Sequence, residues 1–94
     1  MNQYEDMALI FKALAHPSRL RMIEKLKDGA CCVCELRDLV EADISTVSKH
    51  LSLLKQAGIV ASEKRKNNVY YRLLLPCVLD FFSCMINKCE KGGL

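Results

Sequence analysis

Three cysteines at positions 31, 32 and 34 are the residues of this chain best suited to chemistry. Cysteine thiolates are soft ligands that select thiophilic ions such as As(III), Cd(II) or Pb(II) over hard cations. The cluster opens a predicted helix, and a helix N-terminus lowers the pKa of a thiol through its dipole and its free N–H groups. Three thiols within four residues could converge on one trigonal ion if the helix distorts. The spacing therefore predicts a site for a soft metal or metalloid at Cys31, Cys32 and Cys34.

The residues of this cluster also fit roles other than metal binding. Small apolar cysteines fill protein cores, and the Cys31-x-x-Cys34 spacing suggests a redox pair or half of a zinc site. Neither a thioredoxin-like pattern nor a second tight Cys-x-x-Cys pair accompanies it. The last predicted helix holds three further cysteines, Cys77, Cys84 and Cys89, which packing alone could account for. Whether any of the three contributes a ligand is left open by the sequence.

A second group of candidates lies between residues 44 and 72, where positive charge is concentrated. This segment holds six basic residues against Glu63 alone, a net charge of +5, whereas the rest of the chain sums to −2 within a total of +3. Such a concentration is the footprint expected for a polyanion. Short hydroxyl side chains and a lysine follow one face of a predicted helix, and three cations follow in a predicted hairpin. The predicted DNA-contacting residues are Ser45, Thr46, Ser48, Lys49, Ser52, Lys64, Arg65 and Lys66.

Hydrophobic periodicity predicts the helices that must position these residues. Pro17 suits the first position of a helix, where its missing N–H costs nothing, and Asp43 suits an N-cap. Gly58 is predicted to supply the left-handed residue that ends the fourth helix. An apolar stripe of that helix comprises Val47, Leu51 and Leu54. The four predicted helices cover residues 3–15, 17–28, 32–40 and 44–57.

After the fourth helix the period changes to that of strands. Residues 59–65 and 69–75 flank an Asn-rich turn, which predicts a β-hairpin. A last helix is predicted over residues 76–91, and its apolar residues cover more than one face, so it should pack against two surfaces. Helix, turn, helix and hairpin is the order of a winged helix-turn-helix. We therefore predict a mainly α fold with one β-hairpin (α+β), in a single domain over residues 1–94.

The chain resembles the ArsR/SmtB family of metal-sensing winged-helix repressors in three stretches, LAHPSRLRMIEKL, ADISTVSKHLSLLKQAGIV and EKRKNNVYYRL. The resemblance covers roughly residues 8–75, and STVSKHLSLLKQAGIV is similar to the recognition helix of that family. It implies a homodimer built on the first and last helices, which binds double-stranded operator DNA and leaves it when an inducer binds. The fourth helix would enter the major groove, about 12 Å wide. Two such helices predict an imperfect palindrome with half-sites about one turn, roughly 34 Å, apart.

The resemblance extends to the cysteines. Cys32, Val33 and Cys34 look like the Cys-Val-Cys motif of the arsenic- and antimony-responsive members. A further cysteine often follows three residues later, where this chain has Arg37, so we infer that Cys31 supplies the third thiolate. As(III) or Sb(III) is thus the implied inducer, with Cd(II) or Pb(II) as alternatives and no obligatory cofactor. The alternative function is a redox or persulfide sensor of the same fold, in which two cysteines form a disulfide or polysulfide bridge.

Several other functions are disfavoured by the sequence. Zinc-sensing members of the family place Asp and His ligands on the last helix, and here Asp80 has no histidine beside it. No stretch approaches the roughly 18 apolar residues that span a bilayer, and acids stand where a secretory signal carries bases, so a cytoplasmic protein without membrane contact is expected. No acid, base or phosphate loop accompanies the thiols, so neither an enzyme nor a catalytic residue is predicted.

The chain has two histidines. His16 is expected to cap or pack, and His50 to support DNA contact or local hydrogen bonding.

Overall fold

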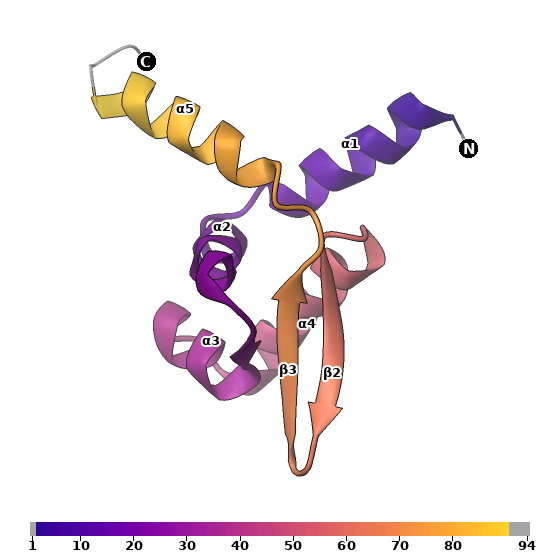
Figure 1. Ribbon diagram of the computed structural model, residues 1–94, viewed down its shortest axis with the longest axis vertical. Coiled ribbons are helices and arrows are strands. Elements are labelled where there is room, and N and C mark those ends of the chain that lie inside the picture. Colours follow the sequence, from indigo (N-terminus) through magenta and orange to yellow (C-terminus); the bar gives the residue numbers. More distant parts are fainter. Residues whose placement is uncertain (1, 91–94) are drawn as a thin grey trace.

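Figure 1 shows a computed structural model of the chain, which describes residues 2–90. Within these residues the helices are α1 (Gln3–Leu14), α2 (Pro17–Lys25), α3 (Val33–Val40), α4 (Ile44–Gln56) and α5 (Val78–Glu90). A 3-10 turn, η1 (Leu26–Asp28), follows α2. One antiparallel sheet contains β1 (Cys31–Cys32), β2 (Val60–Arg65) and β3 (Asn68–Leu73). The order of helices and hairpin is that of a winged helix-turn-helix, as predicted.

Local capping signals determine where the helices begin and end. His16 precedes α2, and its Nδ1 accepts a hydrogen bond from the backbone N–H two residues on, while Pro17 occupies the first turn. At the start of α4 the side chain of Asp43 accepts the N–H of Thr46 at 2.8 Å, which confirms the predicted N-cap. Gly58 follows α4 with a φ of 78°, a conformation that glycine adopts without steric cost. These features confirm that α4 begins directly after Asp43 and that Gly58 separates α4 from the hairpin.

The sheet has a third strand that was not predicted. β1 pairs with β3, with Cys31 opposite Tyr71 and Cys32 opposite Tyr70, and the strand order is β1-β3-β2. Two residues are too few to show the period of a strand, so only the pairing with β3 defines this one. Consequently α3 begins at Val33, and two of the three clustered cysteines precede the helix. The third helix was expected over residues 32–40, and in the structure it begins one residue later, at Val33.

Other boundaries also differ by one to three residues. The second helix, expected to reach residue 28, changes to 3-10 geometry after Lys25, and α5 begins at Val78 because Pro76 and Cys77 form a turn. The first and fourth helices each end one residue early, at Leu14 and Gln56. Residue 91, the expected end of the last helix, lies outside the described residues.

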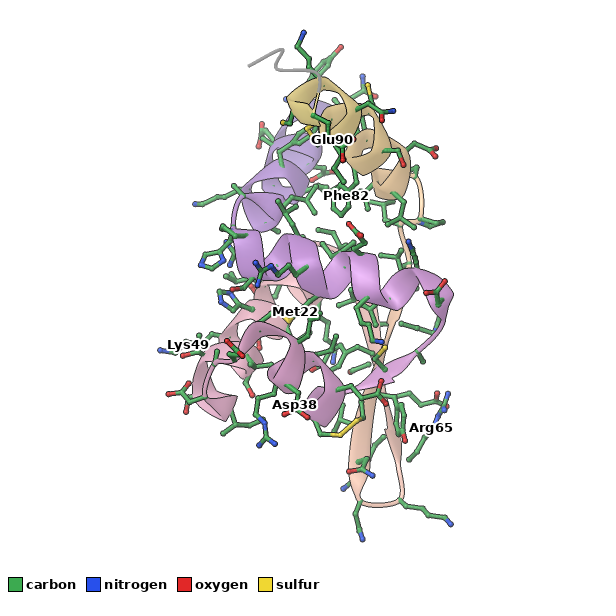
Figure 2. All side chains as sticks on the ribbon, turned by 90° about the vertical axis from the view of Figure 1, so that its left-hand side faces the viewer. Met22, Asp38, Lys49, Arg65, Phe82 and Glu90 are labelled. Atoms are coloured by element: carbon green, nitrogen blue, oxygen red, sulfur yellow. A yellow bond between two sulfur atoms is a disulfide. The ribbon has the colours of Figure 1, made fainter. Side chains whose placement is uncertain are left out.

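One hydrophobic core joins the helices to the sheet. The predicted apolar stripe of α4 lies at its centre, and each of its three side chains is fully buried. In Figure 2 Met22 of α2 lies inside this core, and Phe82 of α5 lies above it. The fully enclosed large side chains are Met22, Ile23, Leu36, Val47, Leu51, Leu54, Ile59 and Val60. The core thus fixes α4 and the sheet relative to α2 and α3.

Apolar surface remains uncovered on α1 and α5. Figure 1 shows that the two helices meet where α1 ends and α5 begins, and that they diverge from there. Phe11 contacts Phe81 edge to face with ring centroids 6.3 Å apart, yet these side chains are 57% and 54% exposed. We call this surface the α1–α5 face; its members are Tyr4, Met7, Phe11, Phe81, Met85 and Ile86, all exposed. α5 buries one side and exposes the other, so the prediction that the last helix packs on two surfaces is confirmed for the buried side and stays a prediction for the exposed side.

Candidate nucleic-acid interface and cysteine cluster

The outward side of α4 presents the polar residues that were predicted to contact DNA. All five of them are exposed, namely Ser45, Thr46, Ser48, Lys49 and Ser52. Figure 2 shows Lys49 extending from α4 away from the body of the protein. The opposite side of α4 is held by the core, so the exposed side is a rigid surface of hydroxyl groups and one cation. A helix of this kind fits the major groove, where short donors and a lysine reach base edges and phosphates.

The N-terminus of α4 also carries a carboxylate. The side-chain and backbone hydrogen bonds with Thr46 hold the pKa of Asp43 below its usual value. Asp43 is therefore ionised at neutral pH, and its charge complements the positive end of the α4 dipole. Because it already accepts the N–H of Thr46, that donor is not available to a phosphate.

The β2–β3 hairpin forms the wing, and its tip carries the predicted cations. Lys66 lies at the turn with a left-handed φ of 55°, and Lys64 precedes it on β2; both are exposed. Arg65 differs, because its guanidinium donates two hydrogen bonds to Glu63, at 3.0 and 3.2 Å, and lies 4.7 Å from the centre of the Tyr70 ring. Of the three cations predicted at the wing, Lys64 and Lys66 thus have no acidic partner among the described residues. Residues two apart on a strand share a face, so the Arg65–Glu63 pair could have been predicted from the strand period.

A contact between α4 and the wing was not predicted. The Nζ of Lys55, near the end of α4, donates a hydrogen bond of 2.8 Å to the hydroxyl of Ser62 on β2. This bond and the burial of Ile59 and Val60 link α4 to the hairpin. The two elements that are predicted to contact DNA therefore form one unit, and the sequence carries no local signal for the pairing of Lys55 with Ser62.

The structure brings two of the three clustered cysteines together. Cys32 and Cys34 are joined by a disulfide. Cys32 is buried at the N-cap of α3, and its sulfur accepts the N–H of Glu35 at 3.4 Å. Cys34 is the second residue of α3 and is exposed. In Figure 2 this sulfur bridge lies at the lower edge of α3, close to the wing.

Cys31 does not join the pair. Successive residues of a strand point to opposite faces, and the sulfur of Cys31 faces the backbone carbonyls of Gly29, at 3.7 Å, and Lys25, at 4.0 Å. Burial raises the pKa of the Cys31 thiol, and the nearby carboxylate of Glu35 raises it further. The expectation that a helix N-terminus lowers this pKa fails because Cys31 lies on β1. Within residues 2–90, no group of three or more Cys, His, Asp or Glu side chains is arranged to hold a metal ion.

The remaining cysteines and the histidines lie elsewhere. Cys77, Cys84 and Cys89 are exposed on or just before α5, which Figure 1 places on the other side of α2 from α3. His16 caps α2 as expected. His50 is only 9% exposed and its ring packs against that of His16 in a tilted arrangement, with centroids 4.4 Å apart. Its Nδ1 is buried without a hydrogen-bond partner, so this atom makes no local hydrogen bond, and the expected support of DNA contact by His50 stays a prediction.

Comparison with known sequences identifies relatives. The sequence profile described as "Bacterial regulatory protein, arsR family" matches residues 16–62, half of the chain. An uncharacterized HTH-type transcriptional regulator of Methanocaldococcus jannaschii, MJ1325, is 42% identical over 73 residues, 76% of this chain and 82% of that protein. A CadC homolog of Staphylococcus aureus, a cadmium resistance transcriptional regulatory protein, is 39% identical over 69 residues. These are 72% of this chain but only 57% of that longer relative.

Comparison with solved structures identifies the same fold. The homodimeric winged helix-turn-helix DNA-binding domain of Mb0332 from Mycobacterium bovis matches with a TM-score of 0.84 at 22% identity, over 95% of this chain and 85% of that one. The antimony-specific transcriptional repressor AntR matches with a TM-score of 0.79 at 31% identity, over 95% of this chain and 84% of that one. No helix within the described residues is long and apolar enough to cross a membrane.

Proposed function

Because this chain belongs to the arsR family of regulatory proteins, we propose that it is a transcriptional repressor that As(III) or Sb(III) releases from its operator DNA. The family consists of DNA-binding transcriptional regulators rather than enzymes, and the winged helix-turn-helix fold agrees with that role. The identity of the inducer and the form of the operator are the proposed parts.

DNA recognition is assigned to α4 and the wing. The exposed side of α4 supplies base-edge contacts, chiefly through Ser45, Ser48 and Lys49. Lys64 and Lys66 supply contacts to phosphate, which add affinity but little sequence preference. The hydrogen bond between Lys55 and Ser62 supports this assignment, because it holds both elements in one orientation.

The proposed operator is an imperfect palindrome read by a homodimer. The exposed α1–α5 face offers aromatic and aliphatic side chains to a second copy, which agrees with the interface implied by the family resemblance. A two-fold dimer presents two copies of α4 to successive major grooves about 34 Å apart.

The observation that carries the proposed inducer is the adjacency of the Cys32 and Cys34 sulfurs at the start of α3. Once reduced, this pair offers two soft ligands to one thiophilic ion. Each As–S bond forms as a thiol gives its proton to a hydroxyl of arsenous acid, which leaves as water. The antimony-specific repressor AntR is a similar protein over nearly the whole chain, which supports a metalloid of this group. Cd(II) and Pb(II) are the alternative ions.

The position of β1 supports a mechanism for release. For Cys31 to become the third ligand, its sulfur must turn from the carbonyls of Lys25 and Gly29 toward the other two. That turn requires the β1 backbone to leave its register with Tyr70 and Tyr71 on the wing strand β3. Ion binding would then uncouple α3 from the wing and displace α4. A coupling of about 1–3 kcal/mol lowers operator affinity roughly 5- to 150-fold.

The test is operator release by the metalloid in a fluorescence-anisotropy titration under reducing conditions. We expect Cys32→Ser and Cys34→Ser proteins to fold, dimerise and bind DNA, yet to stay bound when As(III) or Sb(III) is added. Cys77→Ser, a control on a free cysteine outside the cluster, should release DNA as the parent does. Normal release by the Cys32→Ser/Cys34→Ser double variant, together with loss of release in Cys84→Ser or Cys89→Ser, would assign sensing to α5.

A second candidate function uses the same pair. The Cys32–Cys34 disulfide favours a thiol-based redox repressor, in which a peroxide takes two electrons and two protons from the two thiols. The two candidates differ in a single measurement. A redox sensor releases DNA on addition of peroxide and rebinds it on addition of dithiothreitol, without any metalloid. A metalloid sensor keeps its DNA under peroxide-free reducing conditions until As(III) is added.

A further inference from the structure

A cavity between three helices lies apart from both the cysteine cluster and the α1–α5 face. It has a volume of about 280 Å³. Its lining comes from α1, the first turn of α2, and the end of α4 together with its C-cap, as Leu9, Lys12, Ala13, Arg19, Leu53, Gln56 and Ala57. On α1, Leu9 and Lys12 are one turn apart, whereas Phe11 points to α5. A dimer formed through the α1–α5 face would therefore leave this cavity accessible.

The charged groups in the wall of this cavity are both positive. Lys12 and Arg19 form no salt bridge with any described residue, and the Nε of Arg19 is buried without a hydrogen-bond partner. Three other hollows on the molecule each have Glu24 in their walls, so their cations are balanced locally. The imidazoles of His16 and His50 add no negative charge near Arg19, which itself lowers the pKa of His50. Two unpaired cations and a buried unpaired Nε favour an anionic ligand at this site.

The rest of the lining is apolar. Leu9 and Leu53 are 47% and 45% exposed, which leaves hydrocarbon surface in contact with water beside the two cations. Water occupies about 30 Å³ in the liquid, so the cavity has room for about nine water molecules or one ligand of similar size. A pocket with an apolar floor and a few convergent polar groups is the usual form of a small-molecule site.

We propose that this cavity binds a small amphipathic carboxylate, with the carboxylate on Lys12 and Arg19 and an apolar chain or ring over Leu9 and Leu53. Arginine binds carboxylates through two parallel hydrogen bonds, and the lysine adds a point charge. The site is independent of the proposed metalloid response, because none of the cluster cysteines lines it.

Isothermal titration calorimetry with octanoate tests the proposal. Three comparison ligands separate the effect of the charge from that of the apolar chain. Octylamine keeps the chain but reverses the charge, acetate keeps the charge without the chain, and inorganic phosphate tests a simple anion site. We expect saturable binding of octanoate with a Kd of about 1 mM or tighter, and at least about tenfold weaker binding of the other three. Equal binding of phosphate and octanoate would indicate a phosphate contact instead, and it would overturn the proposal, as would equal binding of octylamine.

Three variants locate the site on the protein. Lys12→Gln should weaken octanoate binding about twofold to fivefold, and Arg19→Gln should weaken it about tenfold. Leu53→Asn should weaken the binding of octanoate while leaving the affinity for acetate unchanged. The matched control is Lys27→Gln, which removes a lysine from the wall of a different hollow and should change nothing. If Arg19→Gln fails to fold, the Lys12→Gln/Leu53→Asn double variant decides, and unchanged octanoate affinity in that protein would refute the site.

Discussion

At the scale of single residues, the cations of the wing differ in whether they already have a partner within the protein. Arg65 donates to Glu63 and covers Tyr70, whereas Lys66 has no acidic partner among the described residues. We predict that Lys66→Ala weakens binding to operator and to unrelated DNA alike, and that it lowers the slope of log K against log salt by about one. Glu63→Gln should do the opposite, because it frees Arg65 for a phosphate. Anisotropy titrations at several salt concentrations measure both effects, and an unchanged slope in Glu63→Gln would contradict the assignment.

Lys49 differs from the wing cations in the kind of contact that its position allows. It extends from the exposed side of α4. We predict that Lys49→Ala lowers affinity for the operator by about 1–3 kcal/mol and affinity for unrelated DNA by less, because a groove contact depends on sequence and a phosphate contact does not. Competition binding with the two DNAs measures the ratio. Equal losses on both would show that α4 does not read bases through this residue.

At the scale of elements, the junction of α2 with α4 should make stability depend on pH. Burial lowers the pKa of His50, and the charges of His16 and Arg19 beside it lower it further. The His50 imidazole is therefore protonated less readily in the native state than in the unfolded chain. The free energy of unfolding should consequently fall as pH decreases from about 7.5 through the native pKa of His50. Urea unfolding followed by circular dichroism between about pH 7.5 and 5 measures this. His50→Leu, which keeps much of the volume and removes the titrating ring, should flatten the decrease; an equally steep decrease would assign it to other groups.

At the scale of the whole molecule, the α1–α5 face should decide whether the protein binds its operator. Phe81 is half exposed and contacts Phe11, at the point where the two helices meet. A charge buried in an apolar interface is strongly unfavourable, so we predict that Phe81→Glu gives a monomer at micromolar concentration that binds the full operator no more tightly than a half-site. Sedimentation velocity measures the mass. Leu39→Glu, on an exposed leucine of α3, is the control and should stay dimeric; a dimeric Phe81→Glu protein would place the interface elsewhere.

Much of the fold was predictable from local patterns. Helix caps such as Asp43, the stop at Gly58 and the buried stripe of α4 depend on residues within one or two turns of each other. The exposed hydroxyl and lysine side of α4 follows from that stripe, because residues opposite a buried stripe face water. The sequence alone therefore determined the order of the helices and the hairpin and the side of α4 that is exposed, since each follows from neighbours along the chain.

Contacts between distant segments were decided only by the tertiary structure. β1 exists because Cys31 and Cys32 pair with β3 at Tyr71 and Tyr70, far along the chain, and this pairing turns the two sulfurs to opposite faces. The burial of His50 against His16 and the bond from Lys55 to Ser62 likewise join separate elements. The cavity between α1, α2 and α4 has the same origin. A sequence pattern records which residues are close along the chain, whereas a side chain's direction in a two-residue strand depends on the partner strand, and that partner is specified by the packed fold.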